Sequence, residues 1–67
     1  MKVVLYSIPG CTRCAMLRKK LNAKGIEFDE CEDGDAIEAM GFTIAPILEV
    51  DGHIMELVDA NEWVKGQ

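Results

Sequence analysis

The residues of this sequence best placed to do chemistry are two cysteines, Cys11 and Cys14, separated by Thr12 and Arg13. Two thiols at this spacing can close a small disulfide ring, and the same pair can bind a metal ion. An apolar run precedes the pair and a helix-like stretch follows it, so we expect Cys11 at a helix N-terminus. Backbone N–H groups and the helix dipole favour negative charge there, and therefore the reactive thiolate. The pattern indicates thiol–disulfide exchange, with metal binding as the alternative.

The composition limits the classes of protein to which the chain can belong. Its 67 residues, 49% of them apolar, predict one domain over residues 1–67. The net charge of −5 argues against nucleic acid or an anionic membrane as a partner. Because we find neither a membrane-spanning stretch nor a secretion signal, we expect a cytoplasmic protein, and nothing requires more than a monomer. Three cysteines do not suit a secreted disulfide framework.

Hydrophobic spacing and turn residues predict the order of the secondary structure. Cys14, Leu17 and Leu21 recur at helical spacing, and Asp51-Gly52 between two apolar runs is a strong hairpin signal. Asp59 opens an Asp-x-x-Glu pattern that resembles a capping box, so the last helix is expected to begin there. The predicted strands cover residues 2–6, 26–29, 47–50 and 53–57, and the predicted helices cover 12–24, 36–40 and 59 onward.

This βαβαββα order predicts an α/β fold. A strand, a crossover helix and a parallel strand are followed by a second helix and an antiparallel hairpin, so the four-stranded sheet is mixed. Helices must cover a sheet to bury its apolar side chains, and we therefore expect helices on both faces. A C-x-x-C motif within a βαβ unit is typical of thioredoxin-like redox proteins.

A second candidate element of the site lies far along the chain. Ala45-Pro46 stands directly before the third predicted strand, and a proline there has no N–H to donate to the sheet. If the bond between Ala45 and Pro46 is cis, the turn is rigid. The backbone of Ile44 and Ala45 is then free to pair with an extended substrate peptide.

With these motifs the chain resembles the glutaredoxins, and more narrowly the glutaredoxin-like electron donors of the NrdH-redoxin type. The resemblance covers nearly the whole chain. The matching segments are Val4-Leu5-Tyr6, Cys11-Thr12-Arg13-Cys14, Thr43-Ile44-Ala45-Pro46, and Asp51-Gly52 with its return strand. It implies a minimal thioredoxin fold in which Cys11 is the nucleophile, Cys14 the resolving thiol, and Pro46 a cis-proline that faces the dithiol.

The resemblance also implies an activity. Such a protein is a dithiol oxidoreductase that reduces protein or small-molecule disulfides without a bound cofactor. Its electrons come from glutathione, or from NADPH through thioredoxin reductase, and ribonucleotide reductase is a typical client. Glutaredoxins usually have a Gly-Gly pair and an acidic residue that help to hold glutathione, where this chain has Leu57-Val58 and Asp59. The candidate substrate contacts are Tyr6, Arg13, Ile44, Ala45, Pro46 and Asp59. A metal-binding module or carrier that uses the same dithiol is the alternative.

Other residues carry weaker signals. Cys31 is expected to follow the second strand, as a small apolar residue or as an additional resolving or regulatory thiol. His53 is expected to be an exposed strand residue. The first predicted helix holds five of the seven basic residues, and the next stretch holds seven of the twelve acidic ones. They are Arg13, Arg18, Lys19, Lys20 and Lys24, followed by Glu27, Asp29, Glu30, Glu32, Asp33, Asp35 and Glu38. The basic helix is either a solvated surface or a face that docks an acidic partner.

Overall fold

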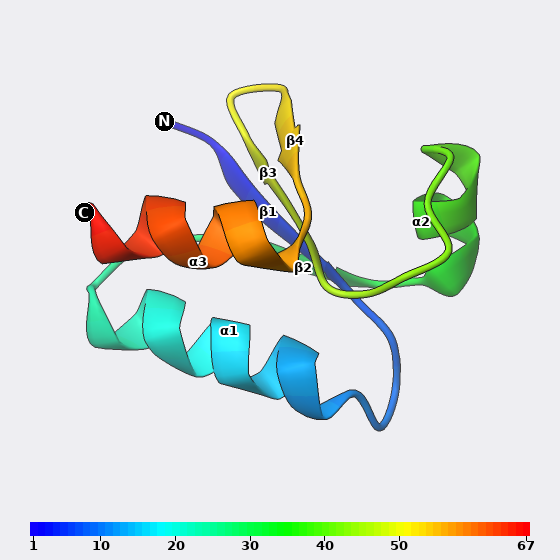
Figure 1. The fold of residues 1–67 in the computed structure, drawn as a ribbon, viewed down its shortest axis with the longest axis horizontal. Helices are drawn as coiled ribbons and strands as arrows, with labels where there is room; N and C mark the ends of the chain where they lie inside the picture. Colours follow the sequence, from blue (N-terminus) through cyan, green and yellow to red (C-terminus); the bar gives the residue numbers. More distant parts are fainter.

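Seven elements follow one another in the predicted order in a computed structural model that describes residues 1–67 (Figure 1). The strands are β1 (Val3–Ser7), β2 (Asp29–Glu32), β3 (Ile47–Val50) and β4 (His53–Met55). The helices are α1 (Thr12–Ala23), α2 (Gly34–Ala39) and α3 (Leu57–Lys65). The βαβαββα order is therefore confirmed.

The four strands form one mixed sheet in the order β2-β1-β3-β4. β1 pairs in parallel with β2 and antiparallel with β3, and β4 completes the antiparallel hairpin with β3. The register of β1 against β3 sets Tyr6 opposite Ile47. The predicted mixed sheet is thus confirmed, with β1 bonded along both of its edges.

Side chains alternate between the two faces of the sheet and give the molecule two apolar clusters. The larger cluster lies beneath α1 and α3, which run side by side along one face (Figure 1). It consists of Val3, Leu5, Leu17, Leu21, Leu48, Val50, Met55, Ala60 and Val64. Trp63 packs against its edge, as the sequence indicated.

A smaller cluster joins the other face of the sheet to α2 and to the start of α1. It consists of Cys14, Ile37, Ala45 and Ile47, with Tyr6, Cys11, Met40, Phe42 and Ile54 packed around it. Because Ile47 and Leu48 are neighbours in β3, their side chains point to opposite faces and into different clusters. Helices therefore lie on both faces, as expected.

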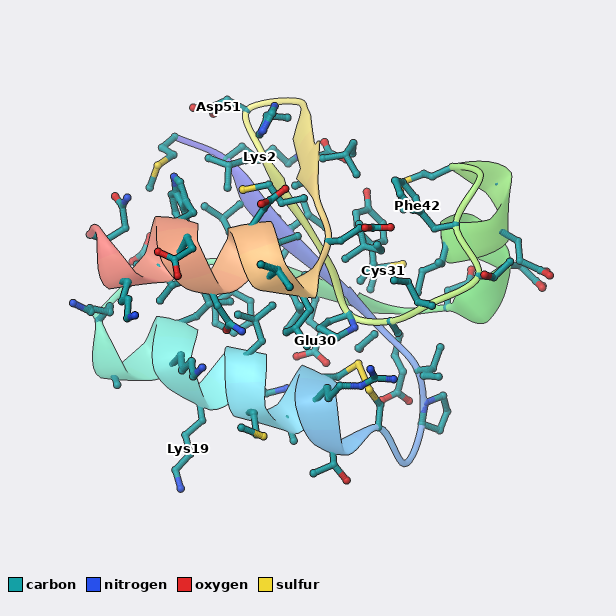
Figure 2. All side chains as sticks on the ribbon, in the orientation of Figure 1. Lys2, Lys19, Glu30, Cys31, Phe42 and Asp51 are labelled. Atoms are coloured by element: carbon teal, nitrogen blue, oxygen red, sulfur yellow. A yellow bond between two sulfur atoms is a disulfide. The ribbon has the colours of Figure 1, made fainter.

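α1 forms where apolar residues recur at helical spacing. Cys14, Leu17 and Leu21 are its buried residues. The opposite side of the helix is charged, and Lys19 points away from the sheet in Figure 2. The helix ends before Gly25, whose φ of +69° lies in the left-handed region that glycine adopts at little cost.

The predicted position of the second strand was wrong by three residues, because β2 begins at Asp29 and not at Ile26. The first residues of the chain are bound to the turn after β3 and not to residues 26–28. The Lys2 N–H donates to Asp51 Oδ1 at 2.7 Å, and the Asp51 N–H donates to the Lys2 carbonyl at 2.9 Å (Figure 2). Pairing of β1 with β2 therefore starts only at Val4 and Asp29.

The predicted start of the last helix was also wrong. α3 begins at Leu57, and β4 ends at Met55 instead of reaching Leu57. Glu56 is the N-cap, and its carbonyl accepts the Ala60 N–H at 2.8 Å, whereas its side chain makes no capping bond. Asp59 consequently lies in the first turn of the helix. None of the three helices has the length and apolar character that crossing a membrane requires.

The larger cluster should supply most of the stability of so small a domain. We expect Leu5→Ala to lower the free energy of unfolding by about 3 kcal/mol, since Leu5 is fully buried in the central strand. Urea unfolding monitored by circular dichroism measures this change. The control is Val58→Ala, a truncation of a side chain that is 74% exposed, which should change stability by less than about 0.5 kcal/mol. Equal effects of the two variants would contradict the assignment of the core.

Candidate active site

The two cysteines lie at the N-terminus of α1 and are joined as a disulfide, with their Cα atoms 5.3 Å apart. Cys11 is the N-cap residue, and its Sγ accepts the backbone N–H of Cys14 at 3.1 Å. Gly10 precedes it with a φ of +70°, a left-handed conformation that favours glycine. The turn from β1 thereby places the Cys11 sulfur at the end of the helix, as the sequence predicted.

The two cysteine residues differ in exposure. Cys14 is 1% exposed and belongs to the smaller cluster, whereas Cys11 is half-buried at its edge. A client disulfide can therefore reach Cys11 but not Cys14. The first turn of α1 holds Arg13 and no acidic residue, so its local charge favours a thiolate at Cys11.

The proline turn lies beside the end of β1. Tyr6, near the end of β1, pairs with Ile47, the first residue of β3. The residues that precede Ile47 therefore lie next to the loop that connects β1 to Cys11. The bond between Ala45 and Pro46 is cis, and both residues are buried. Ala45 packs in the same cluster as Cys14, while Ile44 is 46% exposed. The structure thus brings two distant segments of the chain together around the dithiol.

Tyr6 packs its ring against the smaller cluster and directs its hydroxyl away to Glu49. The hydroxyl donates to Glu49 Oε1 at 3.2 Å. Burial, followed by the negative charge of Glu49, raises the pKa of Tyr6 above its ordinary value, so the phenol stays protonated. A contact between Tyr6 and substrate stays a prediction.

The remaining sequence candidates are not members of the smaller cluster. Arg13 is exposed in the first turn of α1, and Asp59 is exposed in the first turn of α3, outside the smaller cluster. Cys31 lies within β2, not after it as predicted, and it is half-buried opposite Tyr6 in the ladder. In Figure 2 its side chain points towards the side of Phe42, whereas Glu30 points towards α1.

A polar network behind the active-site turn was not predicted. Ser7, the last residue of β1, is fully buried and donates to Glu30 Oε2 at 2.8 Å. Arg18 of α1 donates to both oxygens of the same carboxylate, with Nε 2.7 Å from Oε1. The hydrogen bonds of Arg18, helped by that of Ser7 and opposed by burial, lower the pKa of Glu30 below its ordinary value. The network ties α1 to β1 and β2 close to the dithiol.

Sequence reasoning also missed Ile8, which is 39% exposed on the loop after β1. It borders a depression of about 390 Å³ beside Cys11, which Arg18 and Glu32 also line. An apolar residue between a strand and a Pro-Gly turn gives no local signal of such a role.

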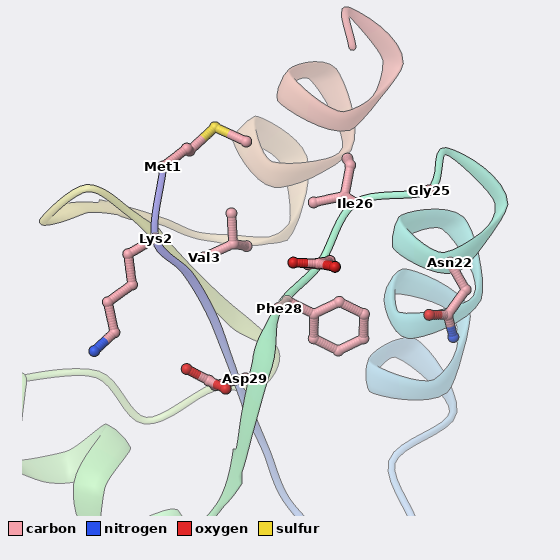
Figure 3. A pocket seen from close by; sticks show the side chains of 9 residues that line it. Met1, Lys2, Val3, Asn22, Gly25, Ile26, Phe28 and Asp29 are labelled. Carbon is pink, nitrogen blue, oxygen red and sulfur yellow. The ribbon is translucent and has the colours of Figure 1, made fainter.

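Two further features of the molecule bear on ligands other than a disulfide. No three His, Cys, Asp or Glu side chains lie close enough together to hold a metal ion, and His53 is exposed in β4. A depression of about 750 Å³ lies at the other end of the sheet, where residues 1–3 and 25–29 diverge (Figure 3). Phe28 and Ile26 line it together with Lys2 and Asp29, and none of its residues comes from the turn that carries the dithiol.

The comparisons with known proteins agree with this geometry. The sequence profile of the glutaredoxin family matches residues 3–55. No curated protein has a sequence significantly similar to this one. Among solved structures, NrdH-redoxin from Escherichia coli, a glutaredoxin-like protein, has 17% identity and a TM-score of 0.75, over 92% of this chain and 93% of that one. A glutaredoxin from Archaeoglobus fulgidus has 18% identity and a TM-score of 0.73, over 97% and 87%.

A larger enzyme contains the same fold. A glutathione S-transferase from the silkworm Bombyx mori has 16% identity and a TM-score of 0.81 over the whole of this chain. The chain spans only 38% of the length of that enzyme. At these identities the likeness concerns the fold alone, and it confirms the predicted thioredoxin-like architecture.

The lowered pKa of Glu30 makes a prediction about stability. A carboxylate whose pKa is lowered by folding stabilises the folded protein at any pH above its ordinary pKa of 4.5. This stabilisation is lost as the pH falls from 4.5 through the lower pKa of the folded state. Glu30→Gln should therefore cost up to about 1 kcal/mol at pH 7, as a partly exposed ion pair does. The difference from the parent should shrink below about pH 4.5. Urea unfolding across this range measures it.

Glu27→Gln is the matched control, because Glu27 is exposed and forms no ion pair. This variant should follow the parent protein at every pH. A deficit of Glu30→Gln that stayed constant down to pH 3 would contradict the role assigned to the network.

Proposed function

Because the chain belongs to the glutaredoxin family of thiol–disulfide oxidoreductases, we propose that it is a dithiol electron donor that reduces disulfides of protein clients. The observation that carries the proposal is the unequal burial of the two cysteine residues at the start of α1. An accessible Cys11 can form a mixed disulfide, and the buried Cys14 lies next to it, ready to resolve it.

The exchange needs only the two thiols of the reduced protein and the client disulfide. The Cys11 thiolate attacks one client sulfur, the client S–S bond breaks, and the other client sulfur leaves as a thiolate that takes up a proton. Cys14 then loses its proton and attacks Cys11 Sγ. The intramolecular disulfide forms, and the second client sulfur leaves. Two electrons have passed from the protein to the client, and an external reductant must restore the dithiol.

A thioredoxin reductase suits this chain better than glutathione as the source of those electrons. In glutaredoxins a Gly-Gly pair helps to hold glutathione, and the corresponding Leu57 and Val58 form the first turn of α3 here. The Leu57 side chain is half-buried, and the Val58 side chain projects into solvent. The reductase in turn draws on NADPH. A cytoplasmic monomer is the form of the protein that this proposal assumes, and ribonucleotide reductase is the family-typical client.

The roles of the two cysteines can be separated by substitution. Cys11→Ser should abolish reduction of insulin by the protein, because the accessible nucleophile is lost. Cys14→Ser should instead accumulate a mixed disulfide between Cys11 and the client, because nothing resolves it. Turnover is followed by NADPH oxidation with thioredoxin reductase, and the trapped species by mass spectrometry.

Cys31→Ser is the matched control, since it removes the third thiol and leaves the pair intact. It should retain the turnover of the parent. Full activity of Cys11→Ser would overturn the assignment of the nucleophile.

The source of electrons is tested with two coupled assays on the same preparation. NADPH oxidation with 2-hydroxyethyl disulfide should be fast with thioredoxin reductase and slow with glutathione plus glutathione reductase. The double variant Leu57→Gly, Val58→Gly should gain turnover with glutathione, because it restores the family's glycine pair. Equal turnover of the parent protein in both assays would reject the preference for the reductase.

A further inference from the structure

A further cavity lies on the side of α2, next to the depression that borders Cys11. It has a volume of about 280 Å³ and lies between the loop after β1, α2 and the segment before Pro46. Its lining residues are Ile8, Gly34, Asp35, Ile37, Glu38, Phe42, Thr43, Ile44 and Ala45. Ile8 also borders the depression next to Cys11, so the two hollows share a wall. The cavity is therefore within reach of a client chain bound at Cys11.

The walls of the cavity are apolar and partly exposed. Ile8 and Ile44 are two of the few large apolar side chains that the molecule exposes, at 39% and 46%, and both face this one place. Ile37 and Phe42 line it from the smaller cluster. Gly34 lies next to Ile8 in this wall, since a Cβ atom at Gly34 would be in ordinary van der Waals contact with Ile8 Cγ2, at 3.6 Å. The cavity has the size and lining for one large aliphatic side chain.

The charged residues that line the cavity itself are all acidic. Asp35 and Glu38 of α2 line it, and no lysine or arginine does. The neighbouring depression holds one residue of each sign, Glu32 and Arg18, and Arg18 is paired with Glu30. The Asp35 and Glu38 side chains are exposed, so they act on a ligand through solvent and are screened by salt. A cation next to the bound apolar group is attracted, whereas a carboxylate in the same place is repelled.

We propose that this cavity, which we call the apolar pocket, binds an aliphatic side chain next to the reactive cysteine of a protein client, and that Asp35 and Glu38 select a lysine or arginine beside it. The assignment rests on the proposed function and names the class of client. Glutathione offers different chemistry, because its two carboxylates outweigh its one ammonium group and no aliphatic side chain flanks its cysteine. The pocket therefore distinguishes basic, apolar peptide disulfides from glutathione disulfide.

The probes are three symmetrical peptide disulfides, blocked at both ends. Their sequences are Lys-Leu-Cys-Leu-Lys, Lys-Ser-Cys-Ser-Lys and Glu-Leu-Cys-Leu-Glu. Each is mixed with protein that has been reduced and freed of reductant, and the second-order rate is followed by chromatography of the released peptide thiol. Flanking charge alters the reactivity of the peptide disulfide itself, so each rate is divided by the rate of the same peptide with dithiothreitol. The uncharged 2-hydroxyethyl disulfide measures the exchange reaction without the pocket.

We expect the Lys-Leu peptide to react about tenfold faster than the Lys-Ser peptide, as partial burial of a leucine would give. We expect it to react about threefold faster than the Glu-Leu peptide at low salt, with the difference shrinking as salt is added. Ile44→Ser should lower the preference for leucine over serine. Asp35→Asn with Glu38→Gln should remove the preference for lysine over glutamate.

A double variant with the same change of charge, Glu27→Gln with Glu62→Gln, is the matched control. Both residues lie outside the pocket, and their neutralisation should leave the ratios between peptides unchanged. Equal corrected rates for the three peptides, together with reduction of 2-hydroxyethyl disulfide, would reject the pocket and keep the proposed function. Failure to reduce any disulfide would reject the proposed function and the pocket with it.

Discussion

The antiparallel pairing of β1 with β3 is the constraint on which the site depends. It sets Tyr6 opposite Ile47, and so brings the Pro46 turn to the loop that leads from β1 to Cys11. Strand side chains alternate, so a slip of one residue would move Ile47 from the smaller cluster to the other face of the sheet. The proline turn would then lose its packing against Cys14. Residues more than thirty positions apart in the sequence form one surface only because this register holds.

α1 connects that surface to the rest of the molecule. Its first turn carries the dithiol, and two buried leucines further along anchor the helix in the larger cluster. Arg18, between the two leucines, donates hydrogen bonds to Glu30, and the Glu30 carboxylate also accepts a hydrogen bond from the buried hydroxyl of Ser7. The middle of the helix is thus linked to the last residue of β1 by a charged network as well as by apolar packing. The position of Cys11 relative to the sheet follows from both.

The sequence predicted the features that are encoded locally. The spacing of Cys14 and the leucines of α1 determines one face of a helix, and the C-x-x-C and Ala45-Pro46 motifs identified the centre of the site. The alternation of Ile26 and Phe28 correctly indicated that their side chains are half-buried. The strand nevertheless begins only at Asp29, because Lys2 is hydrogen-bonded to Asp51 in a distant hairpin and does not pair with this segment. The polar edge strand that replaces it has no hydrophobic pattern to detect. Ser7, Ile8 and Phe42 were likewise missed, since their roles arise from contacts between segments far apart in the chain.

The sheet separates the two apolar clusters, and this separation has a consequence for how such a protein can diversify. Nine residues on one face form the larger cluster, while the dithiol and its surroundings belong to the smaller one. Mutations that reshape the rim around Cys11 need not disturb the packing beneath α1 and α3. Natural selection can therefore change the choice of partner in small steps, through folded intermediates, while the scaffold stays the same.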